Sequence, residues 1–307
     1  MVLMSIVFCL SCNEFIEPSL NHKNMVLLAP TNNLETSNYQ LTFWWEMQQD
    51  ALGYRLQVVS TDFSNIQKLI LDTLVKKDKF TYTLDPGKYQ WRVRAENGSS
   101  QTSYTTQSFI VHPSSLTNNV IQLTSPTNNF FTSSPDVKLE WLNLFGATQY
   151  RVQLDNQNFI DENNLVLNVT TTNLSFLKTL SKEGNYQFRV RGESTTENSK
   201  WSVVRNFSYD ATPPVQVKLT APLNNKTVAK PVQLTWNSIT DAEKYELIVY
   251  QSDLTTLYST SYPMLLTTNT YTFNAGDSNE VIGWKVRAID KAGNKGSFSD
   301  LFSFTIQ

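Results

Sequence analysis

Short runs in which hydrophobic and polar residues alternate recur along this chain and predict β-strands. The alternation is clearest in three segments that each end in a tryptophan, at 41–45, 137–141 and 232–236. Their hydrophobic residues fall at every second position, which is the period of a strand with one buried face. Further strands are predicted at 54–58, 150–154 and 245–249, and at 89–95, 186–192 and 282–288. No helical period of useful length competes, so the pattern predicts an all-β protein.

The same strand pattern occurs three times at a nearly constant interval. Pro30, Pro126 and Pro222 are spaced by 96 residues, and a tryptophan, a tyrosine and an arginine follow each proline with steps of 95 to 97. Such a register predicts three tandem domains, each long enough to bury its own core. The other landmarks are Trp45, Trp141, Trp236, Tyr54, Tyr150, Tyr245, Arg94, Arg191 and Arg287.

Composition narrows the class of protein. Of the 307 residues, 40% are hydrophobic and 17% charged, which is typical of folded, soluble domains. The formal net charge of −2 gives no electrostatic reason to expect a nucleic-acid partner. Both cysteines lie within the first dozen residues, and neither His22 nor His112 has a second ligand at metal-binding spacing. We therefore expect no disulfide in the domains, no metal and no cofactor.

The amino terminus predicts a secreted and lipid-anchored protein. Residues 1–10 form an apolar run of signal-peptide length, and Ser11-Cys12 follows it. A small residue before a cysteine at this place resembles a bacterial lipobox, which implies that Cys12 is acylated after cleavage. Cys9 is a poorer candidate because bulky Phe8 precedes it. Asn13 resembles the outer-membrane sorting pattern of Gram-negative lipoproteins, so the expected location is the outer membrane, on its surface or its periplasmic face.

Two departures from the lipobox pattern leave an alternative open. No Lys or Arg precedes the apolar run, and Cys9 stands where a leucine is usual. The first departure is consistent with a true start codon upstream of Met1. The alternative is an apolar end that is not cleaved.

Each repeat resembles a fibronectin type III domain. An early buried tryptophan, a late tyrosine and no cysteine pair carry this resemblance. Tyr89 and Tyr186 match the family's tyrosine corner, in which the hydroxyl bonds back to the backbone, whereas the third repeat has Ile282 there. Residues 210–214, before the third domain, and 288–294, within it, look like phrases of bacterial immunoglobulin-like surface repeats.

The resemblance implies three tandem seven-stranded antiparallel β-sandwiches of the fibronectin type III or immunoglobulin-like kind. They are expected at 25–113, 118–210 and 214–307, after a signal peptide at 1–11 and a lipidated tether at 12–24. The lipobox and the sandwiches together look like a Bacteroidetes-like lipoprotein. Residues 72–74 (Asp-Thr-Leu) also resemble the short O-glycosylation motif of that group.

Comparison of the repeats identifies candidate binding residues. Trp44 aligns with the polar residues Glu140 and Thr235, so it is expected to face outward. There it would stack on a sugar ring or contact a protein partner. The alternative is that a neighbouring segment covers it. Ile248 and Tyr250 alternate outward from a predicted strand and form a second candidate patch, unless an edge strand or loop covers them.

A basic stripe also faces outward on the second sheet of each domain. In the first domain it consists of Arg55, Arg92 and Arg94. Such a stripe attracts acidic glycans or lipid phosphates, and the alternative is that these long side chains cover the sheet and pair across it. Because outward arginines are ordinary on such strands, we favour the second interpretation.

No enzyme motif is present, and the sequence predicts a non-enzymatic protein. It lacks a Gly-rich phosphate loop, a G-x-S-x-G elbow and an H-E-x-x-H pair. Asp290 and Asn294 are too few oxygen ligands for calcium and predict a turn. The expected role is presentation or capture of a protein or glycan at the envelope. Alternatives are a glycan-binding component of a polysaccharide-uptake system and, remotely, a glycan-active enzyme.

Overall fold

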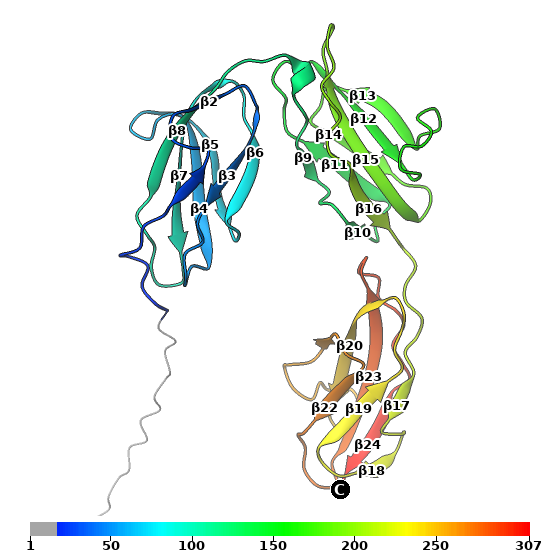
Figure 1. Ribbon diagram of the computed structural model, residues 1–307. Coiled ribbons are helices and arrows are strands. Elements are labelled where there is room, and N and C mark those ends of the chain that lie inside the picture. The colour runs from blue at the N-terminus through cyan, green and yellow to red at the C-terminus, as the bar shows by residue number, and fades with distance from the viewer. Residues whose placement is uncertain (1–16) are drawn as a thin grey trace, which may run out of the picture. The chain divides into compact units, whose positions relative to one another are not determined.

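Three β-sandwiches account for nearly all of the chain that is described (Figure 1). The computed structural model describes residues 17–307, so Cys9, Cys12 and the signal peptide lie outside the described residues. Each sandwich pairs a three-stranded sheet with a five-stranded sheet. This confirms the prediction of tandem all-β sandwiches. No helix within residues 17–307 is long and apolar enough to cross a membrane.

The first sandwich has the sheet orders β1-β3-β6 and β2-β8-β7-β4-β5. The outermost strand β5 is ten residues long and carries two bulges where it pairs with β4. The strands are β1 (Leu27–Ala29), β2 (Leu34–Thr36), β3 (Gln40–Trp45), β4 (Gly53–Thr61), β5 (Ile66–Val75), β6 (Lys79–Thr83), β7 (Gly87–Glu96) and β8 (Thr105–Val111).

The second sandwich repeats this order as β9-β11-β14 and β10-β16-β15-β12-β13. A single 3₁₀ turn, η1 (Leu116–Asn118), precedes it, and the Glu197 carboxylate accepts a hydrogen bond from the Leu116 N–H at 2.9 Å. The strands are β9 (Leu123–Ser125), β10 (Phe130–Thr132), β11 (Asp136–Trp141), β12 (Gln149–Asp155), β13 (Leu167–Thr171), β14 (Ser175–Thr179), β15 (Gly184–Glu193) and β16 (Arg205–Tyr209).

The third sandwich follows the same plan as β17-β19-β22 and β18-β24-β23-β20-β21. Its outermost strand β21 has only three residues, in contrast to the ten of β5. The strands are β17 (Leu219–Ala221), β18 (Lys226–Val228), β19 (Val232–Trp236), β20 (Ala242–Tyr250), β21 (Met264–Leu266), β22 (Thr270–Phe273), β23 (Val281–Asp290) and β24 (Phe302–Ile306).

The repeated Pro-x-Asn-Asn segment moves the chain from one sheet to the other. β1 ends directly before Pro30, which has no N–H to donate to a strand ladder. The chain then joins the opposite sheet as β2. The Asn32 side chain accepts the Ser108 N–H at 3.0 Å, and Asn33 adopts a left-handed φ of 62° while its N–H donates to the Ser108 carbonyl. Asn128, Asn129, Asn224 and Asn225 make the corresponding contacts in the other two sandwiches.

This switch refines the expected strand count and direction. Each sandwich contains eight strands where seven are expected, because two short strands, such as β1 and β2, flank the Pro-x-Asn-Asn segment and lie in opposite sheets. The second half pairs in parallel with the last strand, as β2 does with β8, β10 with β16 and β18 with β24. The other strand pairings described here are antiparallel. Asparagine side chains fix this turn, and a hydrophobic pattern does not register them.

The repeated tryptophan and tyrosine hold the two sheets together. Trp45, Trp141 and Trp236 end the central strands of the three-stranded sheets and are at most 2% exposed. The rings of Trp45 and Tyr54 lie 5.5 Å apart across the core, and the Tyr54 hydroxyl accepts the Gln48 N–H at 2.8 Å. The two rings thus pack in the interior, and the Tyr54 hydroxyl fixes the loop between β3 and β4.

Tyrosine corners close the first two sandwiches, as the sequence predicts. The hydroxyl of Tyr89 donates to the Asp85 carbonyl at 2.8 Å, and that of Tyr186 donates to the Lys182 carbonyl at 2.7 Å. In the third sandwich Ile282 is fully buried instead. There the carboxylate of Glu280, two residues before Ile282, accepts the Asp277 N–H at 2.9 Å, so a side chain also fixes the turn before β23 in this sandwich.

Replacing Tyr89 or Tyr186 by Phe should lower the free energy of unfolding by about 1 kcal/mol, because each change leaves a backbone carbonyl without its donor.

Burial and the nearby Asp85 charge raise the pKa of Tyr89 to about 12. The unfolded chain ionises first, so wild-type stability should fall from about pH 10 to about pH 12, and Tyr89→Phe should flatten this slope.

Chemical denaturation over this pH range measures both effects. Tyr82→Phe is the matched control, because the Tyr82 hydroxyl makes no hydrogen bond with the residues the structure describes. A loss in Tyr82→Phe equal to that in Tyr89→Phe would contradict the corner's contribution.

Candidate binding surfaces

The outer face of each five-stranded sheet carries the predicted basic stripe. The strands β4, β12 and β20 and their neighbours β7, β15 and β23 contribute its side chains in pairs across the ladder. Arg55 lies directly opposite Arg94 in the first sandwich, whereas Glu246 lies opposite Arg287 in the third. Like charges placed opposite one another destabilise a sheet unless they are compensated. The cations on this face have a different set of partners in each of the three sandwiches.

In the first sandwich each arginine has its own partner. Arg55 pairs with Asp72 on β5, and the Arg94 guanidinium pairs with Glu96 at 2.7 Å. Arg92 lies between two rings, with its Cζ 4.0 Å from the centroid of Phe63 and 4.1 Å from that of Tyr104. These contacts occupy the three side chains within the sandwich, and their role in ligand binding stays a prediction.

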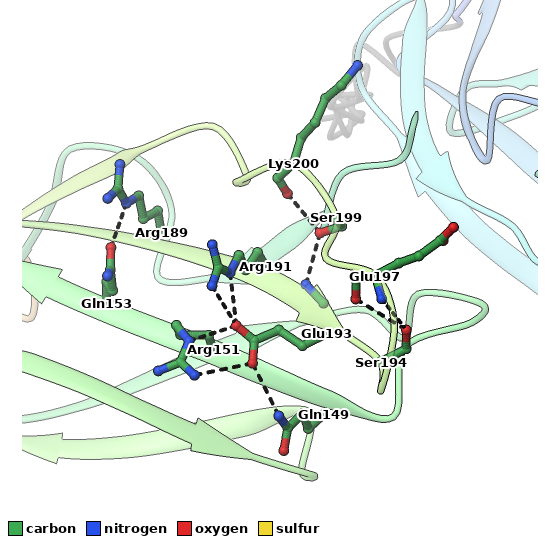
Figure 2. A network of polar contacts seen from close by, with 11 residues as sticks. Gln149, Arg151, Gln153, Arg189, Arg191, Glu193, Ser194, Glu197, Ser199 and Lys200 are labelled. Carbon is green, nitrogen blue, oxygen red and sulfur yellow. Dashed lines mark hydrogen bonds and ion pairs between the residues drawn. The ribbon is translucent and has the colours of Figure 1, made fainter. Parts of the chain in front are cut away.

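In the second sandwich two arginines share one carboxylate. Figure 2 shows Arg151 and Arg191 meeting at Glu193, with Nε distances to Oε1 of 2.7 and 2.9 Å. Gln149 donates to the other oxygen of Glu193 at 3.2 Å. Arg189 stands beside this group with its Cζ 4.3 Å from the Phe159 centroid. A single acid at the end of β15 thus compensates two cations on neighbouring strands.

Glu193 is ionised within this network although it is only 5% exposed. Burial raises the pKa of its carboxyl group, but the hydrogen bonds and charges of Arg151 and Arg191 lower it further, so the net pKa lies below the ordinary value. The carboxylate is therefore stabilised in its charged form. Its contribution to stability is present above the ordinary glutamate pKa and is lost as the pH falls through the lowered value.

In the third sandwich the acid has moved to the opposite strand. Glu246 on β20 accepts from Arg287 at 2.7 Å, and Lys295 lies 3.4 Å from its second oxygen. Lys285 takes the place of an arginine, with its Nζ 4.6 Å from the Phe298 centroid and 5.3 Å from that of Tyr250. Two cations thus share the Glu246 carboxylate, and Lys285 and Lys244 add two more on this sheet.

Trp44 lies on the outer face of the first three-stranded sheet, as the alignment predicts. Its side chain is 46% exposed, and its indole N–H donates to the Asp78 carboxylate at 3.2 Å. Lys79 is directly opposite on β6. In the other sandwiches Glu140 and Thr235 have only small residues opposite, Ser175 and Thr270 on the corresponding strands. An oriented, half-exposed ring with a carboxylate beside it is specific to the first sandwich.

Ile248 and Tyr250 are half-buried on the outer face of β20. Ile248 lies opposite Lys285 and Tyr250 opposite Gly283. The loop after β20 folds back and forms a bridge from Leu257 to Tyr250, and β21 pairs with β20 only as far as Leu247. The pair is therefore covered in part by a loop and in part by the cation of Lys285, and its role in binding a partner stays a prediction.

The sequence comparison missed the rings that stack on the stripe. Tyr104 and Trp201 follow Arg94 and Arg191 by ten residues, and Phe298 follows Arg287 by eleven. The Cζ to centroid distances are 4.8, 4.7 and 4.3 Å. This spacing was readable from the repeat, and it indicates cation–π packing between neighbouring segments of each sheet. Arg191 precedes Glu193 by two residues, as Arg94 precedes Glu96, so that pair was also readable from the sequence. The contact of Glu193 with Arg151 had no such signal, because it depends on the pairing of β15 with β12.

Other sequence candidates take part in turns or strands. The Asp290 carboxylate accepts from the Asn294 backbone and side chain, both at 2.9 Å, which is the arrangement of a turn. Thr73 lies within β5 opposite Leu56 and is half-buried. Residues 17–307 contain no group of three or more His, Cys, Asp or Glu side chains that would hold a metal ion.

Replacing Glu193 by Gln should lower the free energy of unfolding by about 2 kcal/mol at neutral pH, because two partly buried arginines lose their counter-charge. The difference from wild type should shrink as the pH falls through the carboxyl range, since the wild-type group then also becomes neutral. Glu162→Gln, which removes an exposed partner of Arg189, is the matched control and should change stability by less than about 0.5 kcal/mol. Equal effects of the two changes would contradict the shared-carboxylate account.

Comparison with known proteins gives structural similarity alone. No family model and no curated protein matches this sequence. The chain is similar to the crystal structure of chicken CNTN1 FN1–FN3 domains, with 14% identity, a TM-score of 0.42, and coverage of 92% of this chain and 97% of that one. It is also similar to the Clostridium thermocellum CbhA fibronectin(III)-like modules, with 17% identity, a TM-score of 0.40, and coverage of 61% and 94%.

Proposed function

We propose that this chain is a non-enzymatic lipoprotein of the bacterial cell envelope that captures or presents a protein or glycan ligand. Tandem β-sandwiches supply rigid faces on which a binding site can be placed. The observation that carries the binding role is Trp44, a ring that is 46% exposed and held by Asp78. Tryptophan is enriched at interfaces because its ring combines a large apolar face with a polar N–H.

The anchor rests on the sequence of the first twelve residues. The apolar run at 1–10 ends in Ser11-Cys12, and a polar tether follows. Acyl chains on Cys12 would insert into one leaflet at about 0.8 kcal/mol for each buried methylene, which is enough for stable attachment with more than one chain. We infer attachment to the outer membrane, with the three sandwiches beyond the tether.

Glycan capture is the more specific candidate, and the geometry around Trp44 favours it. The exposed indole face provides a stacking platform, and Asp78 and Lys79 beside it provide an acceptor and a donor for sugar hydroxyl groups. A component of a polysaccharide-uptake system would use such a face. A glycan-active enzyme stays the remote alternative, since a pair of carboxylates leaves no local sequence motif.

Palmitate labelling in a bacterium that processes lipoproteins tests the anchor. Wild type should be labelled and sediment with membranes, and Cys12→Ser should lose the label because no thiol is left at the cleavage site. Cys9→Ser is the matched control and should keep it. Label retained by Cys12→Ser would contradict the proposed anchor.

A glycan array with wild type and Trp44→Ala tests the glycan candidate. Removal of the stacking ring should reduce binding by about tenfold or more. Phe130→Ala, which removes a ring of similar exposure from another sandwich, should leave binding unchanged. Wild type that binds no sugar, or Trp44→Ala that binds as wild type does, would contradict glycan capture through this face.

A further inference from the structure

The third sandwich has an excess of positive charge on the outer face of its five-stranded sheet. Lys244, Lys285, Arg287 and Lys295 contribute four cations, and within residues 17–307 Glu246 is the one carboxylate at ion-pair distance from any of them. The first sandwich provides Asp72 and Glu96 for its three arginines, and the second provides Glu193 and Glu162. Among the groups named here, the third face therefore has the largest excess of cations over carboxylates.

A hollow of about 340 Å³ lies on this face, and two of the four cations line it. Lys244 and Lys295 stand at its sides, and Pro263, Leu265 and Ile289 form aliphatic walls. Glu246 is only 7% exposed and is held by Arg287, so it forms part of the base and does not reach out to a ligand. Leu265 is 55% exposed. We call this feature the Leu265 hollow.

The chemistry of the Leu265 hollow fits a peptide better than a sugar. Its apolar walls are aliphatic, whereas a sugar ring stacks on open aromatic faces. The nearby rings of Tyr250 and Phe298 already carry the ammonium group of Lys285. Leu265 belongs to β21, the outermost strand of the sheet, which offers backbone groups to an extended chain.

We propose that the Leu265 hollow binds an acidic peptide segment of a protein partner. The segment's carboxylates contact Lys244 and Lys295, and an aliphatic side chain between them packs against Leu265. Positive charge at the rim attracts and orients the acidic segment, and burial of the aliphatic group provides the short-range contact. This inference rests on the proposed capture function and names the class of partner for the third sandwich.

Fluorescence anisotropy with the full chain and a labelled peptide in which Glu alternates with Leu tests the proposal. Wild type should bind the peptide, more weakly as the salt concentration rises. Lys244→Glu and Lys295→Glu should each weaken binding by about tenfold, and Leu265→Ala should weaken it severalfold. Lys226→Glu on β18 and Leu223→Ala, both exposed outside the hollow, are matched controls that should bind as wild type does.

Two results would overturn the proposal. One is peptide binding that is absent from wild type or is unchanged in Lys244→Glu and Lys295→Glu. The other is binding of polygalacturonate in place of the peptide with loss in the same variants, which would assign the hollow to an acidic glycan. Either result leaves palmitate labelling of Cys12 and sugar binding by Trp44 unaffected, so a failure here is distinguishable from a failure of the proposed function.

Discussion

Packing of two sheets around a buried tryptophan is the constraint on which each sandwich depends, because the described chain contains no cysteine to cross-link them. Trp45 and its counterparts fill the space between the sheets. The tyrosines beside them, such as Tyr54 and Tyr245, accept a backbone N–H and so fix the loop between two strands. The Pro-x-Asn-Asn segment then carries the chain from one sheet to the other. Hydrophobic burial gives the stability, and a few buried hydrogen bonds fix the connections.

Much of the fold was predictable from the sequence because strand alternation is local. The tryptophan strands, the repeat and the corners of Tyr89 and Tyr186 all follow from residue spacing. The split first strand and its parallel pairing were not predictable, since asparagine side chains and a three-residue strand carry no hydrophobic period. Candidate sites divide in the same way. The outward position of Trp44 follows from alignment, whereas Glu193 meets Arg151 only through strand pairing across the sheet.

The three outer faces show how one architecture supports different surfaces. The first two sandwiches match their arginines with acids and rings, so these long side chains cover and stiffen the sheet. The third moves the acid to Glu246, which pairs with Arg287 and Lys295, and it adds Lys244 and Lys285, which have no carboxylate at ion-pair distance within residues 17–307. Trp44 is a comparable exception on the opposite sheet of the first sandwich. The binding surfaces that we propose therefore lie where the repeats differ, while the shared positions maintain the fold.

NMR of the arginine side chains tests this division most directly. If Arg151, Arg189 and Arg191 belong to the folded framework, their Nε–H protons should exchange slowly with water and keep their chemical shifts at high salt and after addition of a soluble polyanion such as heparin. Rapid exchange, or large shifts on addition of the polyanion, would show that these arginines form an open binding surface and would contradict the account.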